Sequence, residues 1–258
     1  MKSRSPSVQQ AFVLHHYDWS ESSLILDLFT REQGRLAVVA KGAKRPYSQL
    51  RAVLLPFQRI QVSLSKPSKS APEDGGAEVV GLRGAEWVGG STLPAGAALF
   101  SGYYLNELLL KLLARQDPHP HLFEAYADTL PHLHANEDAQ SQAALRAFEL
   151  RLLRELGLLP DLSLSTVTQA PLHPDRRYAL NAEAGVVAPV ADAASFSGHE
   201  LVHLQAALLH GSMAALRHAC AGILPALRSS LRSLLHYHLG QRPLRTRQVM
   251  LDLQKLSD

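Results

Sequence analysis

Basic residues are concentrated in one stretch of the N-terminal third of this sequence. Between Gln33 and Pro72 there are eight Lys or Arg residues and no Asp or Glu, although the whole chain holds 26 basic and 23 acidic residues. The eight are Arg35, Lys41, Lys44, Arg45, Arg51, Arg59, Lys66 and Lys69. A segment whose charges all have one sign creates a local positive potential that attracts polyanions. Nucleic acid is therefore the first ligand to consider.

The spacing within this stretch predicts a binding face. Arg35 and Lys41 are separated by an even number of residues, so on an unbroken strand both side chains leave the same side. The charge then continues into a loop that also carries an aromatic ring, Tyr47. Single-stranded nucleic acid requires cations along its phosphates and rings on which its bases stack. The alternative is a solvated basic face that only keeps the domain soluble. The candidate DNA-binding residues are Arg35, Lys41, Lys44, Arg45, Tyr47 and Arg51.

No other group of residues predicts catalysis or a metal site. The thirteen His form several pairs, but residues two apart on a helix point to different faces, and no pair is joined by the ligand set of a zinc site. His199 and His203, one helical turn apart, are the one pair whose geometry would allow a metal. Phosphate-binding glycine loops and the nucleophile elbow of hydrolases are missing. We expect no enzymatic activity, no catalytic residue, no metal and no cofactor.

Composition indicates an ordinary globular protein. The chain has 258 residues, of which 46% are hydrophobic and 19% charged, and its formal charge is +3. It can form one large domain or two smaller ones. Neither an apolar run of membrane-spanning length nor a signal-peptide core is present, which predicts a cytoplasmic location. The single cysteine, Cys220, excludes an internal disulfide, and its apolar neighbours predict a packed core thiol.

The first 88 residues predict strands. Residues 23–30 carry large apolar side chains on both faces, which suits a strand buried on both sides, and a turn closing on Gly34 leads to a second strand at 35–41. Further strands are predicted at about 54–64 and 77–88, joined by a Ser-, Pro- and Gly-rich loop at 65–76. About five strands in 80 residues suit a small closed barrel better than a sandwich.

After residue 88 the apolar period becomes helical. Leucines recur at spacings of three and four over residues 105–113, and a similar apolar face covers 145–156. A shorter helix is predicted within 119–134, and others at 200–210, 213–220 and 223–239, with a final short one after Pro243. Residues 160–197 lose periodicity and predict a loop or a small irregular subdomain. The predicted fold class is α+β, with an all-β domain at 1–88 and an all-α domain at 89–258.

Several segments resemble one known family. Residues 11–63, AFVLHHYDWSESSLILDLFTREQGRLAVVAKGAKRPYSQLRAVLLPFQRIQVS, are similar to the N-terminus of the bacterial recombination mediators called RecO. The shared pattern is a strand, a short E-S/T-S-L stretch, L-F-T/S, a turn closing on Gly-Arg, V-A-K/R-G-A-K/R and a downstream L-x-P-F. The runs ALFSGYYLNELLLKLLARQ, FELRLLRELGLLPDL and YHLGQRPLRTRQVM resemble the same family in order and spacing.

The resemblance implies a function and partners that composition does not show. It implies an N-terminal OB barrel, a helical domain and a non-catalytic DNA repair and homologous recombination protein of the nucleoid. Such a protein binds single- and double-stranded DNA, anneals complementary strands and helps to load recombinase onto DNA coated by single-stranded-DNA-binding protein. The implied partners are the mediator RecR and the acidic C-terminal tail of that coating protein. The alternative is a non-enzymatic adaptor whose barrel and basic face bind acidic protein partners.

Two further expectations depend on the resemblance. Many family members carry four cysteines of a zinc module after the LGLLPDL-type run, but here residues 163–187 contain none, so we expect the module to have lost its zinc. An acidic tail with an apolar end needs cations beside an apolar groove, which favours the helical domain as its site. A solvated basic helix surface is the alternative. The candidate partner-binding residues are Arg217, Arg228, Arg232, Arg242, Arg245 and Arg247.

Overall fold

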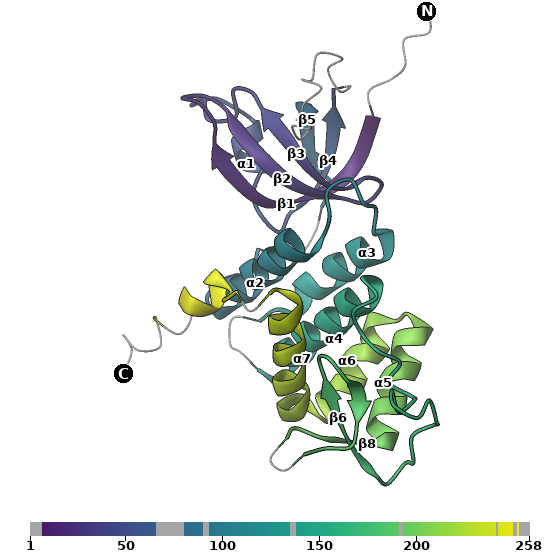
Figure 1. The fold of residues 1–258 in the computed structure, drawn as a ribbon. Coiled ribbons are helices and arrows are strands. Elements are labelled where there is room, and N and C mark those ends of the chain that lie inside the picture. Colours follow the sequence, from purple (N-terminus) through teal and green to yellow (C-terminus); the bar gives the residue numbers. More distant parts are fainter. Residues whose placement is uncertain are drawn as a thin grey trace, which may run out of the picture. The chain divides into compact units, whose positions relative to one another are not determined.

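The structure is a computed structural model that describes residues 7–65, 80–89, 93–134, 138–190, 193–240, 242–249 and 252. The chain forms two compact units (Figure 1). The first takes in Met1–Pro94 and Gly102–Leu130, and the second takes in Ala95–Ser101 and Pro131–Asp258. Most of the loop expected at 65–76, including Lys66 and Lys69, lies outside the described residues.

Five strands of the first unit close into a barrel with the order β1-β2-β3-β5-β4. Neighbouring strands are antiparallel, except that β3 and β5 run parallel. A short helix, α1 (Leu50–Val53), follows β3. The predicted barrel is confirmed. Its fourth strand begins at Arg59 and not near residue 54, because the apolar residues at 54–57 belong to the connection between α1 and this strand. The strands are β1 (Ser7–Asp18), β2 (Leu24–Thr30), β3 (Gly34–Ala40), β4 (Arg59–Leu64) and β5 (Val80–Trp87).

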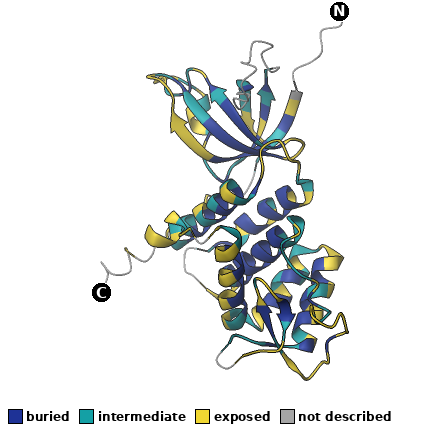
Figure 2. Cartoon of the chain, viewed as in Figure 1, coloured by how far each residue is buried: buried dark blue, intermediate teal, exposed yellow. Residues whose placement is uncertain are grey.

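Strand β2 shows how the barrel core forms. Leu26 and Leu28 point inward and are fully buried in a core of alternating apolar residues from all five strands. Asp27 and Phe29 point outward but are buried as well, which confirms the prediction of a strand covered on both faces over its second half. In contrast, the last part of β1 is exposed (Figure 2).

Two helices pack on the outside of this barrel. They are α2 (Ala97–Leu112), whose residues from Gly102 onward belong to the first unit, and α3 (Pro120–Thr129), which continues into the one-turn 3-10 helix η1 (Leu130–His132). The Phe123 ring lies 5.1 Å from Phe12, and Asn106 donates to the Leu14 carbonyl (3.0 Å) while it accepts from Tyr126. Residue 88 thus lies between the last barrel strand and α2, whereas the first compact unit also takes in Gly102–Leu130.

Four complete helices and a small sheet make up most of the described part of the second unit. Its helices are α4 (Ala139–Glu155), α5 (Gly198–His210), α6 (Met213–Ala221) and α7 (Leu224–His238). Side-chain caps fix their starts: Asp138 accepts from the Ser141 N–H, and Ser197 and Glu200 form a reciprocal capping box. The predicted core thiol is confirmed, since Cys220 is fully buried and burial raises its pKa to about 12.

The segment at 160–197 is more regular than its sequence predicts. Strands β6 (Arg177–Asn181), β7 (Gly185–Val187) and β8 (Phe196–Ser197) form an antiparallel sheet with β6 in the centre. The expectation of a loop or irregular subdomain missed this sheet because its strands are too short to show a period. No helix in the described part of the chain is long and apolar enough to cross a membrane.

Candidate nucleic-acid interface

The segment after β3 folds into successive turns that present its cations to solvent. The Arg45 N–H donates to the Gly42 carbonyl (3.2 Å), and the Ser48 N–H donates to the Arg45 carbonyl (3.0 Å). Gly42 has a φ of 72°, a conformation that residues with a Cβ rarely adopt. Four of the six candidate side chains are exposed and form no hydrogen bond or ion pair with another described residue. They are Lys41, Arg45, Tyr47 and Arg51.

Lys44 attaches this segment to the turn between β1 and β2. Its backbone N–H donates to the Ser22 carbonyl (3.0 Å), and its ammonium donates to the Ser20 carbonyl (3.2 Å). The ammonium also pairs with an Asp18 carboxylate oxygen at 3.1 Å. Part of the Lys44 charge is therefore balanced within the barrel. Its contacts position the neighbouring cations beside the β1–β2 turn.

The Arg35 side chain is mostly buried and is paired within the protein. Its side chain is only 15% exposed, and its Nε lies 3.2 Å from Oδ1 of the buried Asp27. Its guanidinium also donates to the carbonyls of Leu110 and Leu113, at the C-terminal end of α2, where a cation is favoured. Strand alternation does send Arg35 outward, but the Arg35 end of β3 lies against this helix. The structure brings Arg35 to α2 and leaves Lys41 at the exposed end.

Two exposed aromatic residues on β1 and its turn were missed by the sequence analysis. Tyr17 is paired across the strands with Ile25, which is in turn paired with Val39, so the three form one row on the outer surface of β1, β2 and β3. Tyr17 is 48% exposed and Trp19 is 64% exposed. The signal lay in the run HHYDW, where attention to the histidines as metal ligands obscured the two rings.

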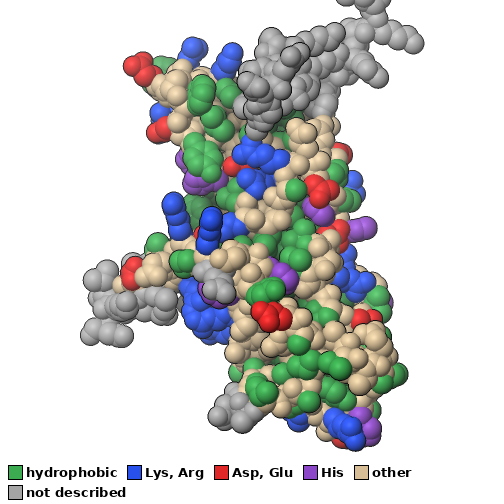
Figure 3. Space-filling model, in the orientation of Figure 1, with side chains coloured by type: hydrophobic (Ala, Val, Ile, Leu, Met, Phe, Trp, Pro, Cys, Tyr) green, Lys and Arg blue, Asp and Glu red, His purple; other side chains and the backbone are tan. Residues whose placement is uncertain are grey.

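Side chains of several types lie at the end of the barrel that carries these residues. Figure 3 shows hydrophobic, basic and acidic side chains close together over this end, and Asp18 and Glu21 supply acidic groups in the β1–β2 turn. Asp18 is matched by Lys44, whereas the exposed cations Lys41 and Arg45 have no acidic partner among the residues described. The surface therefore combines flat rings with uncompensated positive charge.

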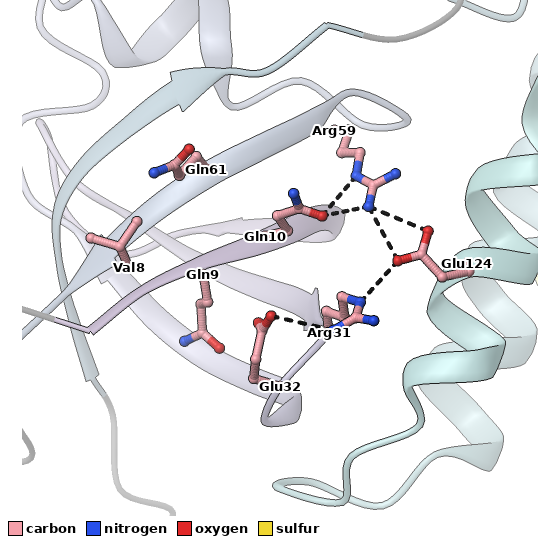
Figure 4. Close-up of a pocket in the computed structure, with 8 residues that line it drawn as sticks. All are labelled: Val8, Gln9, Gln10, Arg31, Glu32, Arg59, Gln61 and Glu124. Atoms are coloured by element: carbon pink, nitrogen blue, oxygen red, sulfur yellow. Dashed lines mark hydrogen bonds and ion pairs between the residues drawn. The ribbon is translucent and has the colours of Figure 1, made fainter.

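A hollow of about 450 Å³ lies on another side of the barrel, beside α3 (Figure 4). Here Glu124 accepts from Arg31 (2.9 Å) and from Arg59 (3.2 Å), and the Arg59 guanidinium also donates to Gln10 and stacks over Phe123. Glu32 adds a second carboxylate 3.9 Å from Arg31. Because the two cations are matched by two carboxylates, this hollow is not a strong anion site, and we do not include Arg59 in the DNA interface.

The candidate partner-binding residues lie in the second unit. Arg228 and Arg232 are exposed and one turn apart on α7, as their spacing predicts, while a different face of α7 is buried through Leu227, Leu231 and Leu234. Arg217 is half-buried on α6. Arg242 is exposed after α7, and the exposed Arg245 and Arg247 lie in a helical turn at 245–249.

In the described part of the chain, the His pairs are not joined by further metal ligands. Residues 199–203 read HELVH and so match the His-Glu-x-x-His pattern of zinc proteases, which an interpretation of the histidines as bare pairs overlooks. The Glu200 carboxylate, however, accepts from the Ser197 N–H (2.7 Å) and lies 3.6 Å from Arg177, so the capping box occupies it. The described residues contain no group of three or more potential His, Cys, Asp or Glu ligands.

The barrel defines the class of this protein. Five strands in the order β1-β2-β3-β5-β4, with a parallel β3–β5 pair, form the OB-like architecture whose strand 2–3 face and adjoining loops bind oligonucleotides in other proteins. Tyr17 and Trp19 lie at the β1–β2 turn, and the other exposed ring and the exposed cations lie in the segment that follows β3.

Sequence comparisons identify the family. Residues 5–72 match the family model Recombination protein O N terminal, and residues 94–248 match Recombination protein O C terminal. The DNA repair protein RecO of Polaromonas naphthalenivorans is 52% identical over 258 residues, which cover 99% of this chain and all of that protein. Proteins of the same name from Variovorax paradoxus and Albidiferax ferrireducens are 52% and 48% identical, over 97% and 100% of this chain. The chain belongs to the RecO family of DNA repair proteins.

Proposed function

We propose that this chain acts in DNA repair and recombination by binding DNA through its barrel, without covalent chemistry of its own. The observation that carries the proposal is the exposed segment after β3, where Lys41, Arg45, Arg51 and the 98%-exposed Tyr47 have no partners among the described residues. Cations of this kind gain free energy from phosphates because binding releases counterions. Family membership supplies the biological context.

The same surface supports strand annealing. Two complementary strands repel each other through their phosphates, and a protein that screens these charges while leaving base edges free lowers the barrier to pairing. No catalytic side chain is needed for that step. Loading of recombinase onto coated DNA and assembly with RecR are proposed on family grounds alone.

Binding and annealing are tested with labelled oligonucleotides of defined sequence. The wild-type protein should bind a single strand at low salt and accelerate pairing of two complementary strands. The triple variant Lys41→Ala/Arg45→Ala/Arg51→Ala should lose most of this acceleration, whereas Arg228→Ala/Arg232→Ala/Arg242→Ala, with the same loss of charge, should keep it. A protein that only binds acidic partners would fail to bind the oligonucleotide even at low salt, which would defeat the proposal.

We further propose that α7 captures the acidic tail of single-stranded-DNA-binding protein. Arg228 and Arg232 support this, since both are exposed on one face and neither has a described partner. A fluorescent tail peptide should bind the full-length protein, Arg228→Ala/Arg232→Ala should weaken it, and Lys41→Ala/Arg45→Ala should not. The opposite pattern would place the tail on the barrel. Full-length variants are required because α2 and α3 pack on the barrel, so a fragment cut near residue 90 would divide the first unit.

A further inference from the structure

Three large rings are exposed at one end of the barrel. Tyr17 ends the outer row of β1, Trp19 lies in the turn that follows, and Tyr47 lies three residues beyond Lys44. Their exposed fractions are 48%, 64% and 98%. A single exposed ring is common on protein surfaces. Three rings in two segments that contact each other are less easily explained by chance.

The contacts of Lys44 hold these rings beside the cations. Its ammonium binds Asp18 and the carbonyl of Ser20, the two residues that flank Trp19. The backbone N–H of Trp19 also donates to the Ser23 carbonyl (3.2 Å), which closes the turn. The backbone around Trp19 is therefore anchored while its side chain stays in solvent. Tyr17 is oriented by His15, whose ring meets it edge to face at 4.5 Å.

Such a surface discriminates between paired and unpaired bases. An exposed ring anchored beside free cations can stack on a base whose phosphate is held by those cations. In a duplex the faces of each base are already covered by its neighbours, so only the phosphates remain available to the protein. An extended acidic peptide would use the cations but would leave the rings unused.

We infer that Trp19 is a base-stacking residue, supported by Tyr17 and Tyr47, which makes the barrel favour unpaired strands over duplex. The inference rests on the proposed DNA-binding function and assigns strand preference to the rings and general affinity to the cations. Trp19 is thus a specificity-determining residue. Lys41, Arg45 and Arg51 bind both forms of DNA.

Fluorescence of Trp19 tests this directly because the chain has only two tryptophans. Trp87→Phe leaves Trp19 as the single indole. Its emission should be quenched by an oligothymidylate in proportion to binding measured by anisotropy, and far less by a blunt duplex of equal length. Trp19→Ala should weaken single-strand binding by about 5- to 150-fold, the range of one stacking contact, and change duplex binding by less than about twofold. Trp19→Phe should recover part of the loss.

The controls separate base stacking by Trp19 from DNA binding in general. Trp87→Ala removes a ring that is 61% exposed on β5 of the same barrel, and it should leave both affinities unchanged. If neither DNA form binds the wild-type protein, the proposed function is wrong. If DNA binds with salt dependence but Trp19 is not quenched, or Trp19→Ala weakens both forms equally, the stacking inference is wrong and DNA binding stands.

Discussion

At the scale of residues, basic side chains that look alike in the sequence have different surroundings in the structure. Arg35 and Arg59 pair with Asp27 and Glu124, whereas Lys41 and Arg45 extend into solvent. The positive charge of the segment could be predicted from composition. Its division into structural and exposed groups could not, because the partner carboxylates come from β2 and α3 and become neighbours only on folding.

Arg35→Ala should therefore change stability. Among the described residues, the substitution leaves the buried Asp27 carboxylate with the more distant Arg115 (3.8 Å), and it removes a donor from two carbonyls at the end of α2. We expect a loss of about 2 to 4 kcal/mol in the free energy of unfolding, measured by urea titration. The exposed Arg45→Ala serves as the control and should stay within about 0.5 kcal/mol of wild type. Equal stability of the two variants would show that the Arg35 contacts contribute nothing.

At the scale of elements, strands and helix starts were predictable, but the covering of the barrel was not. The apolar run at 23–30 predicts a strand buried on both faces, and the helix predicted from residue 200 begins at Gly198 in the structure. The periodicity of α2 shows that one face is buried without showing which surface covers it. For this reason the sequence could not predict that α2 and α3 pack on the outer side of the barrel.

The tight turn between β2 and β3 supplies a test of that packing. Gly34 has a φ of 68°, and a Cβ at this position would lie 1.9 Å from the Asp117 carbonyl oxygen in the α2–α3 connection. Gly34→Ala should cost about 2 kcal/mol or more of unfolding free energy. Gly84→Ala on β5 is the control, because an added Cβ there meets no described heavy atom within 4 Å beyond its chain neighbours, and it should stay within about 1 kcal/mol of wild type. An unchanged free energy of unfolding in Gly34→Ala would mean that the α2–α3 connection does not pack against this turn.

The N-terminal cap of α4 should make the free energy of unfolding depend on pH in the acidic range. Hydrogen bonds from His134 and from the Ser141 backbone lower the pKa of Asp138 from 3.8 to about 2. Because the folded pKa is the lower one, the stabilisation is present above the unfolded pKa and is lost as the pH falls through the folded value. Asp138→Asn keeps a capping acceptor without a titrating group, so its unfolding free energy should fall less between about pH 4 and pH 2. Identical pH profiles in urea titrations would contradict this cap.

At the scale of the whole molecule, the α+β class, the barrel and the family were predictable from sequence. The N-terminal motifs are specific, and the β-to-helix change near residue 90 is plain in the apolar period. The candidate site was predicted in part: the segment at 41–51 carries the exposed cations, but the rings of Tyr17 and Trp19 and the role of Arg35 required the structure. The sheet of β6, β7 and β8 escaped prediction because each strand is at most five residues long.

The cysteine-free segment at 160–197 should fold without a bound metal ion. Leu162, Leu172, Val186 and Phe196 are buried within it, and the Thr166 hydroxyl accepts from the Val186 N–H at 2.8 Å. We expect the purified protein to lack stoichiometric zinc by elemental analysis and its melting temperature to be unchanged by a chelator. One equivalent of zinc per chain, or a chelator-induced fall in melting temperature, would contradict this expectation.

The most direct test of DNA binding at the barrel is the salt dependence of single-strand affinity. Each neutralised phosphate contributes about 0.7 to the log–log slope, so Lys41→Ala/Arg45→Ala/Arg51→Ala should flatten the slope by about 2 units. The equally charged Arg228→Ala/Arg232→Ala/Arg242→Ala variant should leave it unchanged. An unaltered slope in the folded barrel variant, or the same flattening in both variants, would contradict the assignment of DNA to the segment after β3.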